Sequence, residues 1–354
     1  MFEEMMGTKP VSERQRFDVD ALAAYLRAHI SGFPEGDLTV EQFKGGQSNP
    51  TFKVSAGGAC YVLRTKPGPA AKLLPSAHAI EREYRVMDAL QKAGFPAPRQ
   101  YLLCTDESVI GRAFFVMECI EGRVLWDQSL PGMAPAERAA IYDELNRVIA
   151  QLHGTDYAAI GLAEYGKPGN YFARQIERWT RQYQASVTEP IAAMDALIAW
   201  LPANIPPGDD TAIVHGDFRL DNIIFHPSEP RILAVLDWEL STLGHPLADF
   251  SYHLMMYRMP PSLTAGLTGV DLAALNIPDE AAYTAAYCRR TGRDGIANMD
   301  FYVAYNMFRL AAILHGIQGR VVRGTAASAH AKASGAGVAP LAELAWEQAV
   351  KAGA

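Results

Sequence analysis

The sequence lacks the features that define several large classes of protein. It has only four cysteines, which are far apart and form no CxxC pair, and this predicts isolated reduced thiols at Cys60, Cys104, Cys119 and Cys288. No uncharged apolar run reaches the roughly 18 residues that a membrane span requires. The N-terminal residues MFEEMMGTKP are acidic and lack the apolar segment of a signal peptide. We therefore expect a cytoplasmic protein without a membrane partner.

An excess of basic residues is also absent. The net charge is −7 and the pI is about 5.7, whereas nucleic-acid-binding domains are usually basic, so we expect no nucleic-acid partner. The glycine-containing loop at residues 44–50 lacks the GK[ST] ending of a Walker A loop. A hydrophobic fraction of 49% in 354 residues is enough for a large core, in one two-lobed unit or in two domains.

The sequence does contain a dense polar motif between apolar segments, VHGDFRLDN at residues 214–222. We expect a short strand at residues 211–214 to enter this loop and a second strand at residues 222–225 to leave it. A further strand ends in a carboxylate at Asp237, fifteen residues after Asn222. Such a hairpin would gather Asp217, Asn222 and Asp237 at one end.

These side chains have the chemistry that phosphoryl transfer requires. A carboxylate orients the attacking hydroxyl, and oxygen ligands hold Mg²⁺ on the nucleotide phosphates. The order Asp, then Asn five residues later, then Asp at a strand end is that of the catalytic loop and metal-binding Asp of protein kinases. We expect Asp217 to orient the acceptor and Arg219 to face the γ-phosphate. Asn222 and Asp237 are the expected metal ligands, with Glu239 as a weaker candidate.

Other polar residues near the motif have structural explanations. We expect His215 to hold the loop backbone rather than to catalyse. Asp221 would point away from the site if its segment is extended, so it is not a candidate. Asp249, in the helix expected at residues 247–257, should brace the catalytic loop without taking part in the chemistry.

The motifs resemble those of a known family. HGDFRLDN followed by LDWE resembles the aminoglycoside phosphotransferase/choline kinase group of small-molecule kinases. GGQSNPTF, YVLRTKP and PSAHAIEREYRVM resemble the kinase-like domains related to those fused to some acyl-CoA dehydrogenases. The resemblance covers residues 37–320. It implies an α+β, protein-kinase-like two-lobed fold. Its expected parts are an N-terminal arm and helix (1–36), a five-stranded antiparallel, nucleotide-binding N-lobe (37–119) and a mainly helical, catalytic and acceptor-binding C-lobe (120–354).

The cation that would hold the nucleotide phosphates lies on the third expected strand, at residues 59–66. Most of the group has lysine at this position, and here the matching residue is Arg64, with Lys66 two residues on as the alternative. A helix expected at residues 76–93 carries Glu81 and Glu83. The resemblance favours Glu83 as the partner of the strand cation, as in the Lys–Glu pair of kinases.

Two backbone segments complete the implied nucleotide site. The loop between the strands expected at residues 38–43 and 51–55 contains Ser48 and Asn49, and it would cover the phosphates as a lid. The link between the lobes is expected near residue 120. There the backbone groups of Glu118, Cys119 and Ile120 would bond the purine edge of ATP, although the sequence leaves ATP and GTP open.

The acceptor is expected to be small. Asp249 follows only 12 residues after Asp237, which is too short for the activation segment that seats a peptide on a protein kinase. Residues 258–332 contain eight Lys and Arg but five Asp and Glu, a balance of +3 in a chain of −7. A site for a polycationic aminoglycoside should be acidic instead. We therefore expect an anionic or neutral hydroxylated acceptor, and the dehydrogenase-linked relatives suggest a hydroxyacyl-CoA or a hydroxy acid.

The sequence thus predicts a kinase that uses ATP and Mg²⁺ to phosphorylate the hydroxyl of a small molecule. A nucleotide-binding pseudokinase acting as an interaction module is the alternative, and arginine in place of lysine at position 64 is its main support. A protein kinase is a weaker alternative because of the short segment after Asp237. The sequence does not indicate the oligomeric state.

Overall fold

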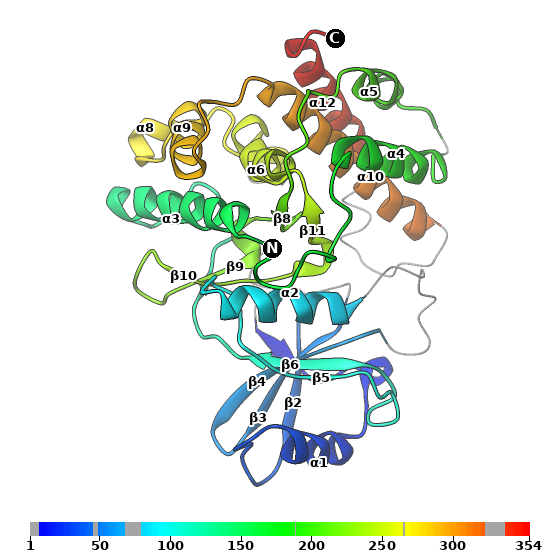
Figure 1. Ribbon diagram of the computed structural model, residues 1–354, viewed down its shortest axis with the longest axis vertical. Coiled ribbons are helices and arrows are strands. Elements are labelled where there is room, and N and C mark those ends of the chain that lie inside the picture. Colours follow the sequence, from blue (N-terminus) through cyan, green and yellow to red (C-terminus); the bar gives the residue numbers. More distant parts are fainter. Residues whose placement is uncertain (1–6, 45–48, 68–78, 188, 265, 323–336) are drawn as a thin grey trace. The chain divides into compact units, whose positions relative to one another are not determined.

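The structure, a computed structural model shown in Figure 1, describes residues 7–44, 49–67, 79–187, 189–264, 266–322 and 337–354. The chain divides into two units. The sheet unit contains Met1–Trp126, Ala158–Tyr165 and Asp221–Ser241. The helical unit contains Asp127–Tyr157, Gly166–Leu220 and Thr242–Ala354.

A six-stranded antiparallel sheet is the centre of the sheet unit. Its strands lie in the order β1-β2-β3-β4-β6-β5. Their bounds are β1 (Thr8–Lys9), β2 (Thr39–Phe43), β3 (Thr51–Ala56), β4 (Ala59–Thr65), β5 (Gln100–Cys104) and β6 (Phe114–Glu118). The five predicted strands are β2 to β6, and the two-residue β1 is a sixth strand that pairs with β2 at the edge of the sheet.

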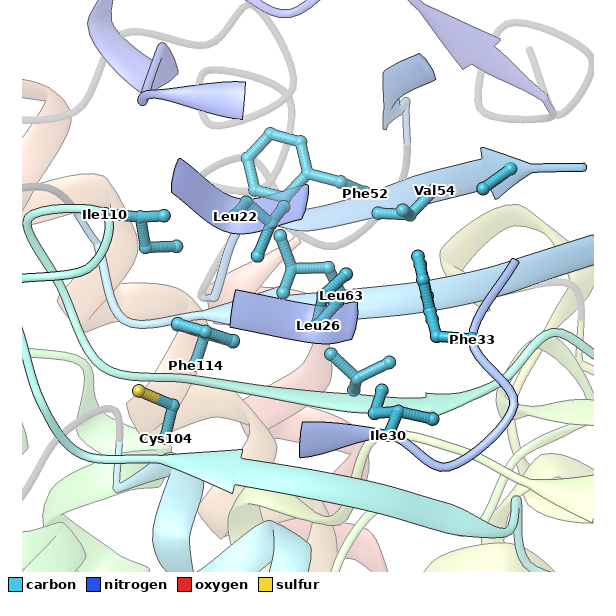
Figure 2. Packing of buried hydrophobic residues seen from close by; sticks show 12 residues of the cluster. Leu22, Leu26, Ile30, Phe33, Phe52, Val54, Leu63, Cys104, Ile110 and Phe114 are labelled. Carbon is cyan, nitrogen blue, oxygen red and sulfur yellow. The ribbon is translucent and has the colours of Figure 1, made fainter. Parts of the chain in front are cut away.

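Helix α1 (Val19–His29) covers one face of this sheet. It begins at Asp18, whose Oδ1 accepts a hydrogen bond of 2.9 Å from the Ala21 amide, and a cap of this kind stabilises a helix by about 1 kcal/mol. Figure 2 shows its apolar residues against the sheet. The buried cluster that they form includes Leu22, Leu26, Ile30, Phe33, Phe52, Val54, Leu63 and Phe114. Each fully buried side chain of this size stabilises the fold by about 1.5–3 kcal/mol.

Helix α2 (Ile80–Lys92) lies on the opposite face of the sheet. The period of two along β4 separates the faces, because Leu63 belongs to the cluster under α1 and Arg64 therefore points the other way. Phe115 of β6 likewise makes an edge-on ring contact with Tyr84 of α2. The same alternation therefore places a buried arginine under a helix that carries Glu83.

A second, three-stranded sheet in the same unit has the order β10-β9-β7. It consists of β7 (Arg123–Val124), β9 (Ile223–Phe225) and β10 (Ile232–Val235). The predicted hairpin between residues 211–214 and 222–225 is wrong. Strand β8 (Ala212–Val214) pairs with β11 (Thr242–Gly244) in the helical unit, and β9 pairs with β10. Short apolar strands of similar composition do not specify their partners, so the sequence could not distinguish these pairings.

The helical unit is built from long helices with one short strand pair. Its main helices are α3 (Pro135–Gly154), α4 (Tyr171–Gln184), α5 (Ala192–Ala203), α6 (Pro246–Leu254), α9 (Glu280–Thr291), α10 (Met299–Val322) and α12 (Val338–Lys351), with short helices α7 (Pro261–Thr264) and α8 (Leu272–Leu275). Helix α10 packs against α12, α4 and α6, while α3 packs against α9 (Figure 1). In the described part of the chain no helix is long and apolar enough to cross a membrane.

The prediction that all four cysteines are unpaired is wrong for two of them. Cys60 at the start of β4 and Cys119 just after β6 form a disulfide, with their Cα atoms 5.5 Å apart. Strands β4 and β6 pair antiparallel with Tyr61 opposite Glu118, so the next residues outward are brought together. The residues are 59 positions apart in the sequence, and only the strand register makes them neighbours. Cys104 and Cys288 are free and buried.

Two buried histidines of the helical unit should make the stability of the protein depend on pH. Burial lowers the pKa of His245 and of His253 to about 4, below the 6.5 of an exposed histidine. At a pH between 4 and 6.5 the unfolded chain therefore binds protons that the folded chain does not bind. The contribution of the neutral histidines to stability is complete above pH 6.5 and is lost as the pH falls toward 4. We expect the fully buried His253 to cost about 2 kcal/mol of unfolding free energy between pH 7.5 and pH 5.

Urea unfolding at these two pH values measures the effect. His253→Gln is the comparison, because glutamine can still bond the Tyr283 hydroxyl that lies 2.7 Å from His253 Nε2. The variant should lose less stability on acidification than the parent protein. Equal losses of stability in the two proteins would contradict the assignment of this pH dependence to His253.

Candidate functional site

The loop that carries Asp217 is fixed through its backbone. Asp249 of α6 accepts hydrogen bonds from the His215 and Gly216 amides, at 2.6 Å and 2.8 Å. His215 is buried, and its Nδ1 lies 3.2 Å from the Asp217 amide. Gly216 has a φ of +85°, a conformation that glycine adopts without strain. The contacts predicted for His215 and Asp249 are therefore present, and together they hold the loop backbone at residues 215–217.

The Asp217 carboxylate is held by two side chains of the helical unit. The Tyr252 hydroxyl donates a hydrogen bond of 2.5 Å to Oδ1, and Nε of Arg219 lies 3.3 Å from the same oxygen. The Arg219 side chain is 44% exposed, so its guanidinium remains accessible to a ligand. Tyr252 was not predicted. The signal that would have found it is its spacing of three residues from Asp249, which places both on one face of α6.

In the sheet unit, Arg64 is the centre of a buried ion-pair network. Its Nε lies 2.8 Å from Glu83 Oε2, and its Nη2 lies 2.8 Å from Asp237 Oδ1 and 3.8 Å from Glu239 Oε2. The predicted pairing of Arg64 with Glu83 is present. Lys66 instead pairs with Glu81, so the two cations of β4 each contact a different carboxylate of α2. Because the guanidinium is a planar fork, one side chain can join a helix carboxylate to Asp237.

Burial and charge act in opposite directions in this network. Burial raises the pKa of Glu83 to about 7, against the lowering effect of Arg64. Burial also works to lower the pKa of Arg64, but Glu83, Asp237 and Glu239 together hold it above its ordinary value. The amide of Asn49 donates a 2.7 Å hydrogen bond to Glu83 Oε1. Arg64 therefore stays charged, and Glu83 is fixed on both of its oxygens.

The two expected metal ligands are neighbours in the sheet unit. The Leu236 amide donates a hydrogen bond of 2.8 Å to the Asn222 carbonyl, which places Asn222 beside the residue that precedes Asp237. Asp237 has a left-handed backbone, with φ +64° and ψ +61°, which is uncommon outside glycine and is frequent at functional sites. The segment 220–222 is a 3₁₀ turn and not a strand, so the extended geometry that excluded Asp221 was wrong.

The donor set fits Mg²⁺. Asp237 and Glu239 both direct a carboxylate oxygen at the same Arg64 nitrogen, so the pair already accommodates a positive charge. Magnesium in kinases is held by one or two carboxylates together with phosphate oxygens, and it neutralises charge on the transferred phosphoryl group. Among the described residues no cluster of three or more His, Cys, Asp or Glu side chains could hold a metal. The binding of the ion by Asn222 and Asp237 jointly with a nucleotide stays a prediction.

The predicted purine-binding segment follows β6. The Glu118 amide donates to the Arg99 carbonyl at 2.9 Å, so this N–H is not available to a purine. Cys119 is tied to Cys60 by the disulfide. Three residues on, a Cβ on Gly122 would lie 2.3 Å from the Phe225 carbonyl oxygen, so only glycine fits beside β9. The backbone at Cys119 and Ile120 is thus held at both ends, and its contact with a purine stays a prediction.

The predicted phosphate lid is only partly described. Ser48 lies outside the described residues. Asn49 is fully buried, and its side chain donates a hydrogen bond to Glu83, the carboxylate that pairs with Arg64. The nucleotide-binding candidates that the structure describes, and both metal ligands, belong to the sheet unit, whereas Asp217 and Arg219 belong to the helical unit. The chain passes from one unit to the other between Leu220 and Asp221, within the catalytic motif itself.

Comparison with known proteins identifies the family of the chain. A profile described as the Phosphotransferase enzyme family matches residues 39–302, three quarters of the chain. The chain belongs to this family. A crystal structure from Ralstonia eutropha JMP134, named for the aminoglycoside phosphotransferases, is 60% identical, with 95% of this chain and 99% of that chain covered and a TM-score of 0.87. The predicted resemblance and the kinase-like α+β fold are therefore confirmed.

Curated relatives of this phosphotransferase family member carry a different name. Acyl-CoA dehydrogenase family member 10 of Mus musculus is 45% identical over 98% of this chain, and family member 11 of Gallus gallus is 45% identical over 96%. The chain spans only 32% and 44% of their lengths. Aminoglycoside phosphotransferase APH(4)-Ia, solved in a ternary complex with AMP-PNP and hygromycin B, is 16% identical. That structure covers 95% of this chain and 99% of its own, with a TM-score of 0.62, and shows the fold alone.

Proposed function

We propose that this phosphotransferase is a kinase that transfers the γ-phosphoryl group of ATP to a hydroxyl of a small molecule. The observation that carries the proposal is the position of Arg64, which contacts both Glu83 and Asp237 at 2.8 Å. In protein kinases the strand cation pairs with the helix glutamate and the metal-binding Asp must also be in place. A pseudokinase does not need this network, so its presence favours an active enzyme over an interaction module.

The parts of the reaction follow from the chemistry of these residues. The guanidinium of Arg64 would hold the α- and β-phosphates, with Glu83 fixing its direction. Asn222 and Asp237 would hold Mg²⁺, which supplies positive charge to the phosphate oxygens. Asp217 would accept a hydrogen bond from the acceptor hydroxyl and align it for in-line attack. The γ-phosphoryl group moves to the acceptor oxygen as its bond to ADP breaks, ADP leaves, and Asp217 would accept the hydroxyl proton.

A small, non-cationic acceptor remains our proposal, although its support has changed. The excess of basic residues at 258–332 is partly neutralised by carboxylates outside this segment, since Arg293 pairs with Asp210 and Arg290 with Asp143. The stronger support comes from the relatives, whose names contain acyl-CoA dehydrogenase. A kinase joined to an acyl-CoA dehydrogenase would act on an acyl compound that bears a hydroxyl. We propose a hydroxyacyl-CoA or hydroxy acid as the acceptor class.

The test is Mg²⁺-dependent nucleotide consumption with a panel of acceptors. The panel contains hydroxyacyl-CoAs, hydroxy acids, amino alcohols, sugars and an aminoglycoside such as kanamycin, and each is assayed with ATP and with GTP. Turnover confined to the hydroxyacyl compounds would support the proposal. Turnover of kanamycin alone would overturn the acceptor class. Nucleotide binding without turnover of any acceptor would favour the pseudokinase.

A further inference from the structure

One oxygen of Asp217 is held by a residue that the kinase motif does not include. Tyr252 of α6 donates its hydroxyl to Oδ1 of Asp217 at 2.5 Å, a short distance that is typical of a hydrogen bond to a charged oxygen. The Arg219 contact with the same oxygen is longer, at 3.3 Å, and the Arg219 side chain is much more exposed. Tyr252 is 6% exposed. The tyrosine thus makes the shorter and more buried of these two contacts to this carboxylate.

Tyr252 is itself fixed by a buried cation. The guanidinium of Arg309, from α10, lies 5.2 Å from the centre of the Tyr252 ring and 5.8 Å from that of Trp179. Its Nη2 donates a hydrogen bond of 2.7 Å to the Gly216 carbonyl, one residue before Asp217. Arg309 is 6% exposed and forms no ion pair with a carboxylate in the described part of the chain. It therefore joins the backbone of the Asp217 loop to the ring that holds the Asp217 side chain.

We propose that Tyr252, held in place by Arg309, is a positioning residue for phosphoryl transfer and fixes the rotation of the Asp217 carboxylate toward the acceptor hydroxyl. The inference rests on the proposed function. A carboxylate turns readily about its Cβ–Cγ bond, so the loop backbone alone does not determine which way its oxygens point. With Oδ1 bonded to Tyr252, one orientation is selected before the acceptor binds. Alignment of this kind lowers the barrier because less freedom is lost in reaching the transition state.

Tyr252 acts only as a hydrogen-bond donor in this arrangement. Burial raises the pKa of its hydroxyl, and the neighbouring Asp217 raises it further, so the group stays protonated throughout the working pH range. It therefore takes no part in the removal of the acceptor proton. A hydrogen bond to a charged group of this kind is worth a factor of roughly 10–100 when its loss affects the transition state.

The experiment compares Tyr252→Phe with Tyr257→Phe. Both tyrosines are buried and close in sequence, but the Tyr257 hydroxyl donates to the Pro278 carbonyl and does not contact Asp217. Phenylalanine keeps each ring, so both variants should fold. We expect Tyr252→Phe to lower kcat about 10–100-fold with the nucleotide KM within a factor of about 2, and Tyr257→Phe to change kcat less than about 3-fold. In Asp217→Ala, which removes the carboxylate that Tyr252 would position, the further change Tyr252→Phe should have no effect on residual turnover.

Thermal unfolding of the same variants gives a readout that needs no acceptor. If the contact is present in solution, Tyr252→Phe should shift Tm less in the Asp217→Ala background, where no oxygen remains to accept the hydrogen bond, than in the parent protein. Additive Tm shifts, or a kcat for Tyr252→Phe equal to that of Tyr257→Phe, would overturn the inference while leaving the kinase intact. Absence of turnover with any acceptor in the parent protein would overturn the proposed function and this inference with it.

Discussion

Asp217→Asn should reduce turnover by a factor on the order of 10³ while leaving nucleotide affinity nearly unchanged. Asparagine has almost the shape of aspartate and still accepts the Tyr252 hydrogen bond at its amide oxygen, so the loop should remain folded. Its neutral amide cannot orient the hydroxyl of the substrate as the negatively charged carboxylate does. Apart from Arg219, which is expected to face the γ-phosphate, the nucleotide contacts proposed here belong to residues of the sheet unit, and the substitution does not touch them. Steady-state kinetics and calorimetric titration with AMP-PNP and Mg²⁺ measure the two quantities separately.

Asp221→Asn is a matched control for this experiment. It removes one negative charge four residues further along the same motif, from a residue to which we assign no chemical role. If turnover depends on the overall charge of the loop, both variants should be impaired alike. If Asp217 orients the acceptor, only the Asp217→Asn variant should lose turnover. Equal loss of nucleotide affinity and turnover in Asp217→Asn would show that the residue supports the fold instead.

Local sequence predicted most of the strands and helices because their signals are local. Asp18 begins α1 as expected, and composition and spacing along one segment were sufficient for this prediction. The pairing of Arg64 with Glu83 is also present, but it was implied by the family resemblance. The spacing of Asp217, Asn222 and Asp237 likewise indicated kinase chemistry before any contact was known. The assignment of these three residues as base and metal ligands still rests on that spacing and on the family.

The features that the sequence missed depend on which distant segments pair. The disulfide between Cys60 and Cys119 exists only because β4 and β6 are neighbours in one register. Strand β8 leaves its sequence neighbour β9 for β11. Tyr252 and Arg309 reach the Asp217 loop from helices that follow it by tens of residues. The sequence gives no signal for the contact of Arg309, and for Tyr252 its signal is the spacing of three residues from Asp249. Pairing and packing of this kind are set by the whole fold, in which many short apolar strands compete for partners.

Helix α6 shows how packing converts a motif into a site. Asp249 and Tyr252 lie one helical turn apart, and they hold respectively the backbone and the side chain of the Asp217 loop. Phe218 also packs edge-on against His253 of the same helix. Helix α6 therefore contacts the backbone of the loop at His215, the Asp217 carboxylate and the Phe218 ring. Because α10 packs on α6 and supplies Arg309, substitutions along these two helices are expected to change turnover more than nucleotide affinity.

Arg64→Met should lower both stability and nucleotide affinity, and the two losses can be separated. Removing the guanidinium leaves Glu83, which is 2% exposed, without its cation, and because burial raises the pKa of this carboxyl to about 7 even beside Arg64, the variant must bind a proton at Glu83 to avoid an unpaired buried charge. Adding Glu83→Gln supplies a neutral side chain without this protonation, and the glutamine oxygen still accepts the Asn49 hydrogen bond. We expect the double variant to recover most of the lost Tm. It should not recover affinity for ATP and Mg²⁺, because no cation remains to hold the phosphates.

Lys66→Met is the control that decides between the two cations of β4. Lys66 and its partner Glu81 are partly exposed, at 27% and 36%, so the loss of this pair should cost no more than about 1 kcal/mol. If Arg64 is the phosphate-binding cation, Lys66→Met should keep nucleotide affinity within about 3-fold, while Arg64→Met weakens it by at least about 30-fold. The opposite order would assign the phosphates to Lys66. Recovery of affinity together with Tm in the double variant would mean that Arg64 only supports the fold.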